Sequence, residues 1–185
     1  MQIVKNYLYN AMYQVFIIIV PLLTIPYLSR ILGPSGIGIN SYTNSIVQYF
    51  VLFGSIGVGL YGNRQIAFVR DNQVKMSKVF YEIFILRLLT ICLAYLLFVA
   101  FLTINGQYHE YYLFQSIAIV AAAFDISWFF MGIENFKVTV LRNFIVQLLA
   151  LFSIFLFVKS YNDLNIYILI TVLSTLIGNL TFFPS

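Results

Sequence analysis

Long apolar stretches alternate with short polar connections along almost the whole chain of 185 residues. Six of these stretches reach the length of about 20 residues that a helix needs to cross a bilayer. They run near residues 7–28, 39–61, 79–104, 112–131, 140–158 and 166–183. They are too long and too evenly apolar for barrel strands, and lipid requires every backbone polar group to be satisfied internally. The pattern predicts an all-α, polytopic membrane helical bundle of six transmembrane helices.

Composition and charge agree with a membrane protein and give it an orientation. Hydrophobic residues make up 62% of the chain and charged residues only 9%, against about 25% charged residues in soluble domains. If the N-terminus is inside, the outer connections hold only Arg30 and Lys159. The inner connections then hold Lys5, Arg64, Arg70, Lys75, Lys78, Lys137 and Arg142. This asymmetry predicts a multi-pass protein of the cytoplasmic membrane with a cytoplasmic N-terminus. Membrane lipids, and not nucleic acid, are the partner that such charges favour.

Several kinds of chemistry find no support in the sequence. Cys92 is the single cysteine, which excludes an intrachain disulfide and a multi-cysteine metal site. Gly57, Gly59 and Gly62 spell GxGxxG, but an apolar span precedes them where a dinucleotide site needs a strand. Close helix packing or a local kink explains these glycines better. The sequence offers no hydrolase triad, metal cluster or phosphate-binding loop, so we expect no enzyme activity, no cofactor and no metal.

Polar side chains form a stripe on each of the first two predicted helices. In the second span Asn40, Asn44 and Gln48 fall within about 80° of one another around the helix axis. In the first span Asn10 and Gln14 repeat the four-residue spacing. Two such stripes on consecutive helices predict a hydrated cavity that both helices line. The alternative is that these side chains hydrogen-bond between helices and serve packing alone.

Two charged residues lie well away from the ends of the predicted spans, where each costs about 2.5 to 3.5 kcal/mol. Arg87 and Asp125 both lie about 9 to 12 Å from the same end of neighbouring helices, at 1.5 Å per residue. This matched depth predicts an ion pair. The pair either holds two helices together or places charge on a pathway for an anionic substrate or a coupling cation. Near the membrane boundary, Glu134 precedes Lys137 by three residues, which suits a salt bridge.

Two blocks of sequence, residues 27–67 and 125–143, resemble the N-terminal half of Wzx-type polysaccharide flippases. These proteins export O-antigen, capsule or teichoic acid precursors. They belong to the multidrug, oligosaccharidyl-lipid and polysaccharide exporter (MOP) superfamily. The matching residues are Arg30, Gly33, Pro34, Gly36, Gly38, Arg64, Asp125, Trp128, Gly132, Glu134 and Arg142.

The resemblance implies a carrier that moves undecaprenyl-diphosphate-linked oligosaccharide to the outer leaflet by alternating access between two six-helix lobes. It also implies a cationic cavity, for which Arg30 and Arg87 are candidates. Residues 1–185 correspond to the N-terminal lobe, and the C-terminal lobe is absent. We therefore expect a fragment that is inactive alone and is completed by the missing half or by a homodimer. A small-molecule antiporter of the same superfamily and a membrane polymerase or ligase of the same pathway are the alternatives.

Overall fold

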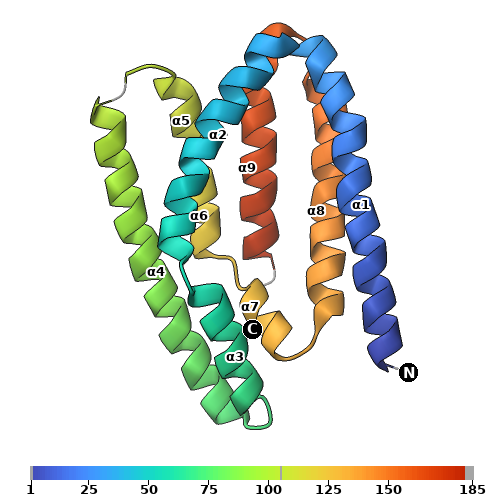
Figure 1. Ribbon diagram of the computed structural model, residues 1–185, viewed down its shortest axis with the longest axis vertical. Helices are drawn as coiled ribbons and strands as arrows, with labels where there is room; N and C mark the ends of the chain where they lie inside the picture. Colours follow the sequence, from blue (N-terminus) through green and yellow to red (C-terminus); the bar gives the residue numbers. More distant parts are fainter. Residues whose placement is uncertain (1, 105, 182–185) are drawn as a thin grey trace.

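The described part of the chain is a bundle of helices joined by short turns (Figure 1). The computed structural model describes residues 2–104 and 106–181; the side chains of residues 2–13, 16, 17, 136 and 137 are not described. The helices are α1 (Gln2–Ile31), α2 (Gly33–Ser55), α3 (Val58–Val69), α4 (Gln73–Ile104), α5 (His109–Gln115), α6 (Ile117–Ala123), α7 (Ser127–Gly132), α8 (Phe136–Phe157), the short 3₁₀ helix η1 (Tyr161–Asp163) and α9 (Leu164–Leu180). The predicted all-α class is confirmed.

Five segments of the described chain are long and apolar enough to cross a membrane. They are Gly33–Val69, Gln73–Ile104, His109–Gly132, Val138–Phe157 and Tyr161–Leu180. The first predicted span corresponds to α1, a helix of 30 residues whose part Ile18–Ile31 is apolar. The predicted spans therefore match helical segments throughout the described chain, although two of these segments are not continuous helices.

The second and fourth predicted spans are each broken within the bundle. The second span divides into α2 and α3 at Gly57, whose φ of +74° lies in the left-handed region that glycine adopts without strain. The fourth span consists of α5, α6 and α7, and Asp125 lies in the break between α6 and α7. Figure 1 shows the two breaks at a similar height along α4, which runs past both as one unbroken helix.

Three groups of buried side chains hold the bundle together. One group joins α2, α4, α5 and α6 around Phe98 and Ile119, and a second joins α3, α4 and α7 around Ile66 and Trp128. The third group joins α1, α8 and α9. Along α4 the first two groups lie on either side of Arg87.

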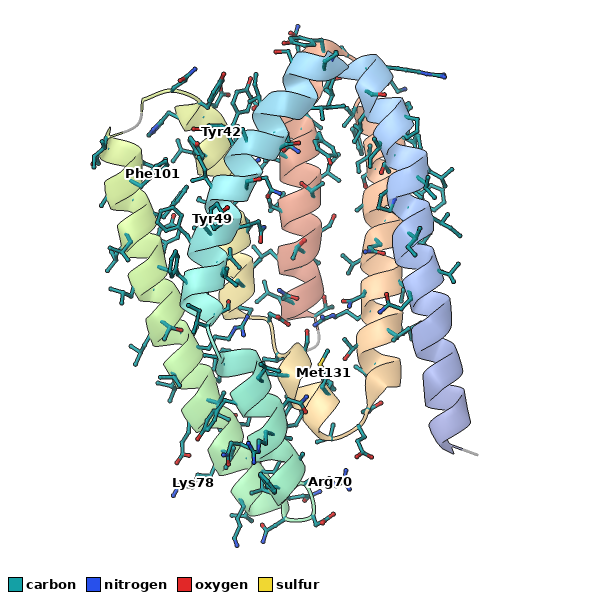
Figure 2. All side chains as sticks on the ribbon, viewed as in Figure 1. Tyr42, Tyr49, Arg70, Lys78, Phe101 and Met131 are labelled. Carbon is teal, nitrogen blue, oxygen red and sulfur yellow. The ribbon has the colours of Figure 1, made fainter. Side chains whose placement is uncertain are left out.

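The connections between the predicted spans lie at the two ends of the bundle. The N-terminal end of α1, the α3–α4 turn and the α7–α8 connection all lie toward one end, at the bottom of Figure 1. Figure 2 shows Arg70 and Lys78 at this end. We call it the basic end. This arrangement agrees with the positions that the sequence assigns to the inner connections.

Candidate functional site

A cavity of about 560 Å³ opens among α2, α4, α5, α6 and α9. Side chains with amide, hydroxyl or charged groups make up most of its lining. They are Asn40, Asn44, Gln48, Ser55, Arg87, Gln115, Asp125, Tyr167, Thr171, Thr175 and Asn179. A polar cavity of this size within an apolar helical bundle is a typical place for a ligand, because sites of about 300 to 1,000 Å³ hold small molecules.

The predicted polar stripe of α2 lies on the wall of this cavity. Asn40, Asn44 and Gln48 all line it, and Gln115 of α5 donates a hydrogen bond from Nε2 to Asn40 Oδ1 at 3.1 Å. The structure places the second polar wall on a different helix from the first span that the sequence predicted. The second polar wall comes from α9, and α1 packs mainly against α8. Gln14 is exposed on α1 and is not among the described lining residues.

One further predicted residue of α1 cannot be placed, because the side chain of Asn10 lies outside the described residues. Arg30, a candidate for the cationic lining, lies exposed in the last turn of α1 and does not line the described cavity. Arg87 does line it. Of the two arginines that the resemblance implies, only Arg87 is therefore at the cavity.

Two side chains of α4 donate hydrogen bonds to carbonyl groups next to the helix breaks. Arg87 donates from Nε to the carbonyl oxygen of Ala122, near the end of α6, at 2.7 Å. Thr90, one turn further on, donates to the carbonyl oxygen of Gly54, near the end of α2, at 2.6 Å. The arginine charge also suits the partial negative charge of a helix C-terminus. The continuous helix α4 thus stabilises both broken helices at the depth of the cavity.

The structure contains the ion pair between Arg87 and Asp125. Arg87 Nη2 lies 3.5 Å from Asp125 Oδ2, and the two side chains are 5% and 36% exposed. Asp125 Oδ1 accepts hydrogen bonds from the backbone N–H of Ser127, at 3.0 Å, and from the Ser127 hydroxyl. One carboxylate oxygen therefore faces α4, and the other satisfies donors at the start of α7.

A second, smaller cavity of about 300 Å³ adjoins the first at Asp125 and Asn179, which line both. Arg142 lines this second cavity. The sequence placed Arg142 in an inner connection, but it lies buried in α8, where Nη2 donates to Ser127 Oγ at 3.1 Å. Arg87, Asp125, Ser127 and Arg142 thus form one hydrogen-bonded chain from α4 to α8.

Two glycines of the GxGxxG stretch serve the local kink and the close packing that the sequence offered as alternatives. Gly57 forms the break between α2 and α3. A Cβ on Gly62 would lie 2.6 Å from Trp128 Cε3, so α3 and α7 approach through this glycine. In the opposite direction, Gly132 of α7 packs directly against Ile66 of α3. Trp128 and Gly132 of the resemblance are therefore packing residues of the α3–α7 contact.

The remaining residues of the resemblance lie away from the cavity. Gly33, with a φ of +67°, and Pro34 form the turn into α2, and Gly36 and Gly38 follow in its first turns. Arg64 lies exposed on α3, 5.7 Å from the ring centre of Phe68.

Glu134 has a partner, Arg70, that its sequence spacing did not suggest. It accepts from Arg70 Nη1 at 2.5 Å, joining the α7–α8 connection to the end of α3. This contact raises the pKa of Arg70 above its ordinary value, chiefly through the hydrogen bond to Glu134. Both side chains are largely exposed, so the pair contributes little to stability. The side chain of Lys137, the expected partner, is not described.

Several cavity residues were missed in the sequence, although a signal for them exists. Tyr167, Thr171, Thr175 and Asn179 repeat every four residues along α9 and all line the cavity. Asn179, which is buried, also donates to the carbonyl oxygen of Ala121 at 2.7 Å. The same spacing argument that found the stripe of α2 would have found this one.

Comparison with known proteins supplies the family. The family model described as "Polysaccharide biosynthesis protein" matches residues 3–183. The chain is 26% identical over 165 residues to a protein named "Putative O-antigen transporter" from Escherichia coli (strain K12), covering 88% of this chain and 40% of that protein. It is 31% identical over 148 residues to a protein of the same name from Shigella dysenteriae, covering 78% and 37%.

No solved structure matches the chain. The chain spans about 40% of the length of the curated relatives named above. The family match, in contrast, extends over nearly the whole chain. The chain belongs to the polysaccharide biosynthesis protein family.

Proposed function

We propose that this chain is the N-terminal lobe of a flippase that translocates undecaprenyl-diphosphate-linked oligosaccharide across the bacterial cytoplasmic membrane. The observation that carries the proposal is the polar cavity, with the Arg87–Asp125 pair at its edge, inside a bundle of apolar helices. Buried polar and charged groups are costly in a membrane and usually mark a substrate or ion path. Membership of the family and the names of the two transporter relatives support this kind of substrate.

The broken helices support a transport role for this cavity. Carriers commonly build their binding sites from interrupted helices, because irregular backbone is tolerated in a membrane where it lines a cavity or is buried in protein. Here Asp125 lies in the break between α6 and α7, and Ser55 lies at the end of α2 next to its break. Under the proposal, the open side of the cavity faces a second lobe or a second copy of the chain, and the two bodies move against each other.

The orientation is part of the proposal. The basic end of the bundle, which carries Arg70 and Lys78 (Figure 2), faces the cytoplasm together with the N-terminus. The cavity then receives its substrate from the cytoplasmic leaflet and releases it toward the outer one.

A transport assay tests the proposal. The chain alone, and a chimera in which it replaces the matching N-terminal part of the Escherichia coli relative, are reconstituted into liposomes with labelled lipid-linked oligosaccharide. We expect no transport by the chain alone and measurable transport by the chimera, because alternating access needs two bodies around one site. A folded chimera that moves small cations or drugs and no lipid-linked oligosaccharide would favour the antiporter alternative. Transport by the monomeric chain alone would contradict the two-lobe architecture.

A further inference from the structure

Two rows of polar side chains face the cavity from different helices, and their chemistry is complementary. On α2 the row is Asn40, Asn44 and Gln48, which we call the amide ladder. On α9 it is Tyr167, Thr171 and Thr175, which we call the hydroxyl ladder. Each row repeats every four residues, so each presents one continuous polar face of its helix.

The two ladders together offer both hydrogen-bond donors and hydrogen-bond acceptors. Amide side chains carry two donor hydrogens and one acceptor oxygen. In the hydroxyl ladder, Thr171 donates its hydrogen to the carbonyl oxygen of Ile168 at 2.7 Å, and Thr175 donates to that of Thr171 at 2.9 Å. Both threonines line the cavity, and with their hydrogens engaged their hydroxyl oxygens can act there only as acceptors. A ligand held between the ladders must donate hydrogen bonds as well as accept them.

The charges of the cavity balance each other. Arg87 and Asp125 are the charged residues among the described lining, and they are paired. The Arg87 guanidinium also donates to the carbonyl oxygen of Ala122, and the residue is only 4% exposed. A diphosphate carries negative charge and only acceptor oxygens, so it needs unpaired cations and has no use for the acceptors of the hydroxyl ladder. This lining suits a neutral ligand.

Two buried polar atoms at the cavity have no protein partner in the described structure. They are Oε1 of Gln115, whose side chain is 2% exposed, and Oγ of Ser55. A buried polar atom without a partner costs about 1 to 3 kcal/mol. Neither atom has appreciable surface that water can reach, so a ligand contacts them only after the surrounding side chains move.

We propose that this cavity is a carbohydrate subsite, which binds an uncharged sugar residue of the lipid-linked substrate and leaves the diphosphate to be bound elsewhere. Sugar hydroxyls both donate and accept, which matches the donors and acceptors of the two ladders. The inference rests on the proposed function and adds that this lobe recognises the sugar part of the substrate. It also means that Arg87 stabilises the broken helices and does not bind the diphosphate.

Binding measurements on the full 185-residue chain in lipid nanodiscs test the inference. The probes are undecaprenyl diphosphate and the same lipid carrying one glucose, N-acetylglucosamine or fucose. Asn44→Leu removes a rung of the amide ladder, and Thr175→Val removes an acceptor of the hydroxyl ladder with little change of shape. Ser45→Leu is the matched control, because Ser45 is the next residue of α2, is exposed and does not line the cavity. Helix content and elution volume establish that each variant is folded.

We expect at least one sugar-bearing lipid to bind the chain about tenfold more tightly than undecaprenyl diphosphate. Asn44→Leu and Thr175→Val should each weaken that binding about five- to tenfold, the loss expected for one or two hydrogen bonds, and leave undecaprenyl diphosphate unaffected. Ser45→Leu should change neither affinity. Equal binding of all lipids to the unmodified chain, or equal weakening of all lipids by Asn44→Leu, would overturn the subsite and leave the proposed function standing. Binding of none of these lipids would overturn the subsite, and transport by the chimera then decides separately whether the proposed function stands.

Discussion

The pair of Arg87 and Asp125 gives the sharpest energetic prediction. Asp125→Ala removes the carboxylate and leaves the Arg87 side chain, 5% exposed, without its counter-charge. Removing one partner of a buried pair typically costs about 3 to 5 kcal/mol, because the remaining charge is uncompensated. Asp125→Ala also removes the acceptor for the backbone N–H of Ser127.

Arg87→Ala should be less damaging than Asp125→Ala. The Asp125 side chain that remains is 36% exposed and can be solvated through the cavity. The main loss is the hydrogen bond from Arg87 to the carbonyl oxygen of Ala122, about 1.5 to 3 kcal/mol for a charged donor. In the double variant neither charge is left alone. Its destabilisation should fall short of the sum of the two single effects by about 1 to 3 kcal/mol.

The assay is reversible unfolding in mixed detergent micelles, with helix content measured as the denaturing detergent is increased. Lys78 and Glu82 provide a matched control, since they form an exposed pair at 3.9 Å on the same helix α4. Their coupling energy should be about 0.5 kcal/mol or less. If the Arg87 and Asp125 effects add within about 0.5 kcal/mol, the pair is not coupled and the reasoning is refuted.

Two further predictions concern packing and topology. Gly62→Ala places a Cβ 2.6 Å from Trp128 Cε3 and should lower the free energy of unfolding by about 1 to 3 kcal/mol in the same assay. Gly59→Ala is the control and should be tolerated, because no atom lies within 4 Å of its Cβ. Equal effects of the two variants would contradict the α3–α7 contact. A reporter that is active only in the cytoplasm should be active when fused after Lys75 and inactive when fused after Gln107, because basic connections stay inside; the reverse pattern would overturn the orientation.

The sequence predicted those features that depend on local composition and spacing. The spans follow from runs of about 20 apolar residues. The cavity position of Asn40, Asn44 and Gln48 follows from helical periodicity, and the contact between Arg87 and Asp125 follows from matched depth on neighbouring helices. Each of these inferences needs only the residues of one helix or the order of two helices.

Features that depend on distant packing were not predicted. Hydropathy continues across Asp125, so it gives no sign of the break there, and it gives no sign that Thr90 and Arg87 of α4 stabilise the two breaks. The choice of α9 over α1 as the second wall depends on how the helices assemble. Arg142 looked like an inner-loop charge because it follows a polar connection, but α8 begins before it and buries it.

Under the proposed function the amide ladder of α2 faces water inside the membrane, and thiol labelling tests this most directly. In a Cys92→Ser background, Gln48→Cys and Tyr49→Cys differ by about 1.5 Å in depth but point about 100° apart. Gln48 lines the cavity, and Tyr49 is exposed on the outside of α2. A membrane-impermeant maleimide should label Gln48→Cys in membrane vesicles and leave Tyr49→Cys unlabelled, with lipid-linked oligosaccharide protecting the former. Equal labelling of the two positions, or no labelling at Gln48→Cys, would contradict the account.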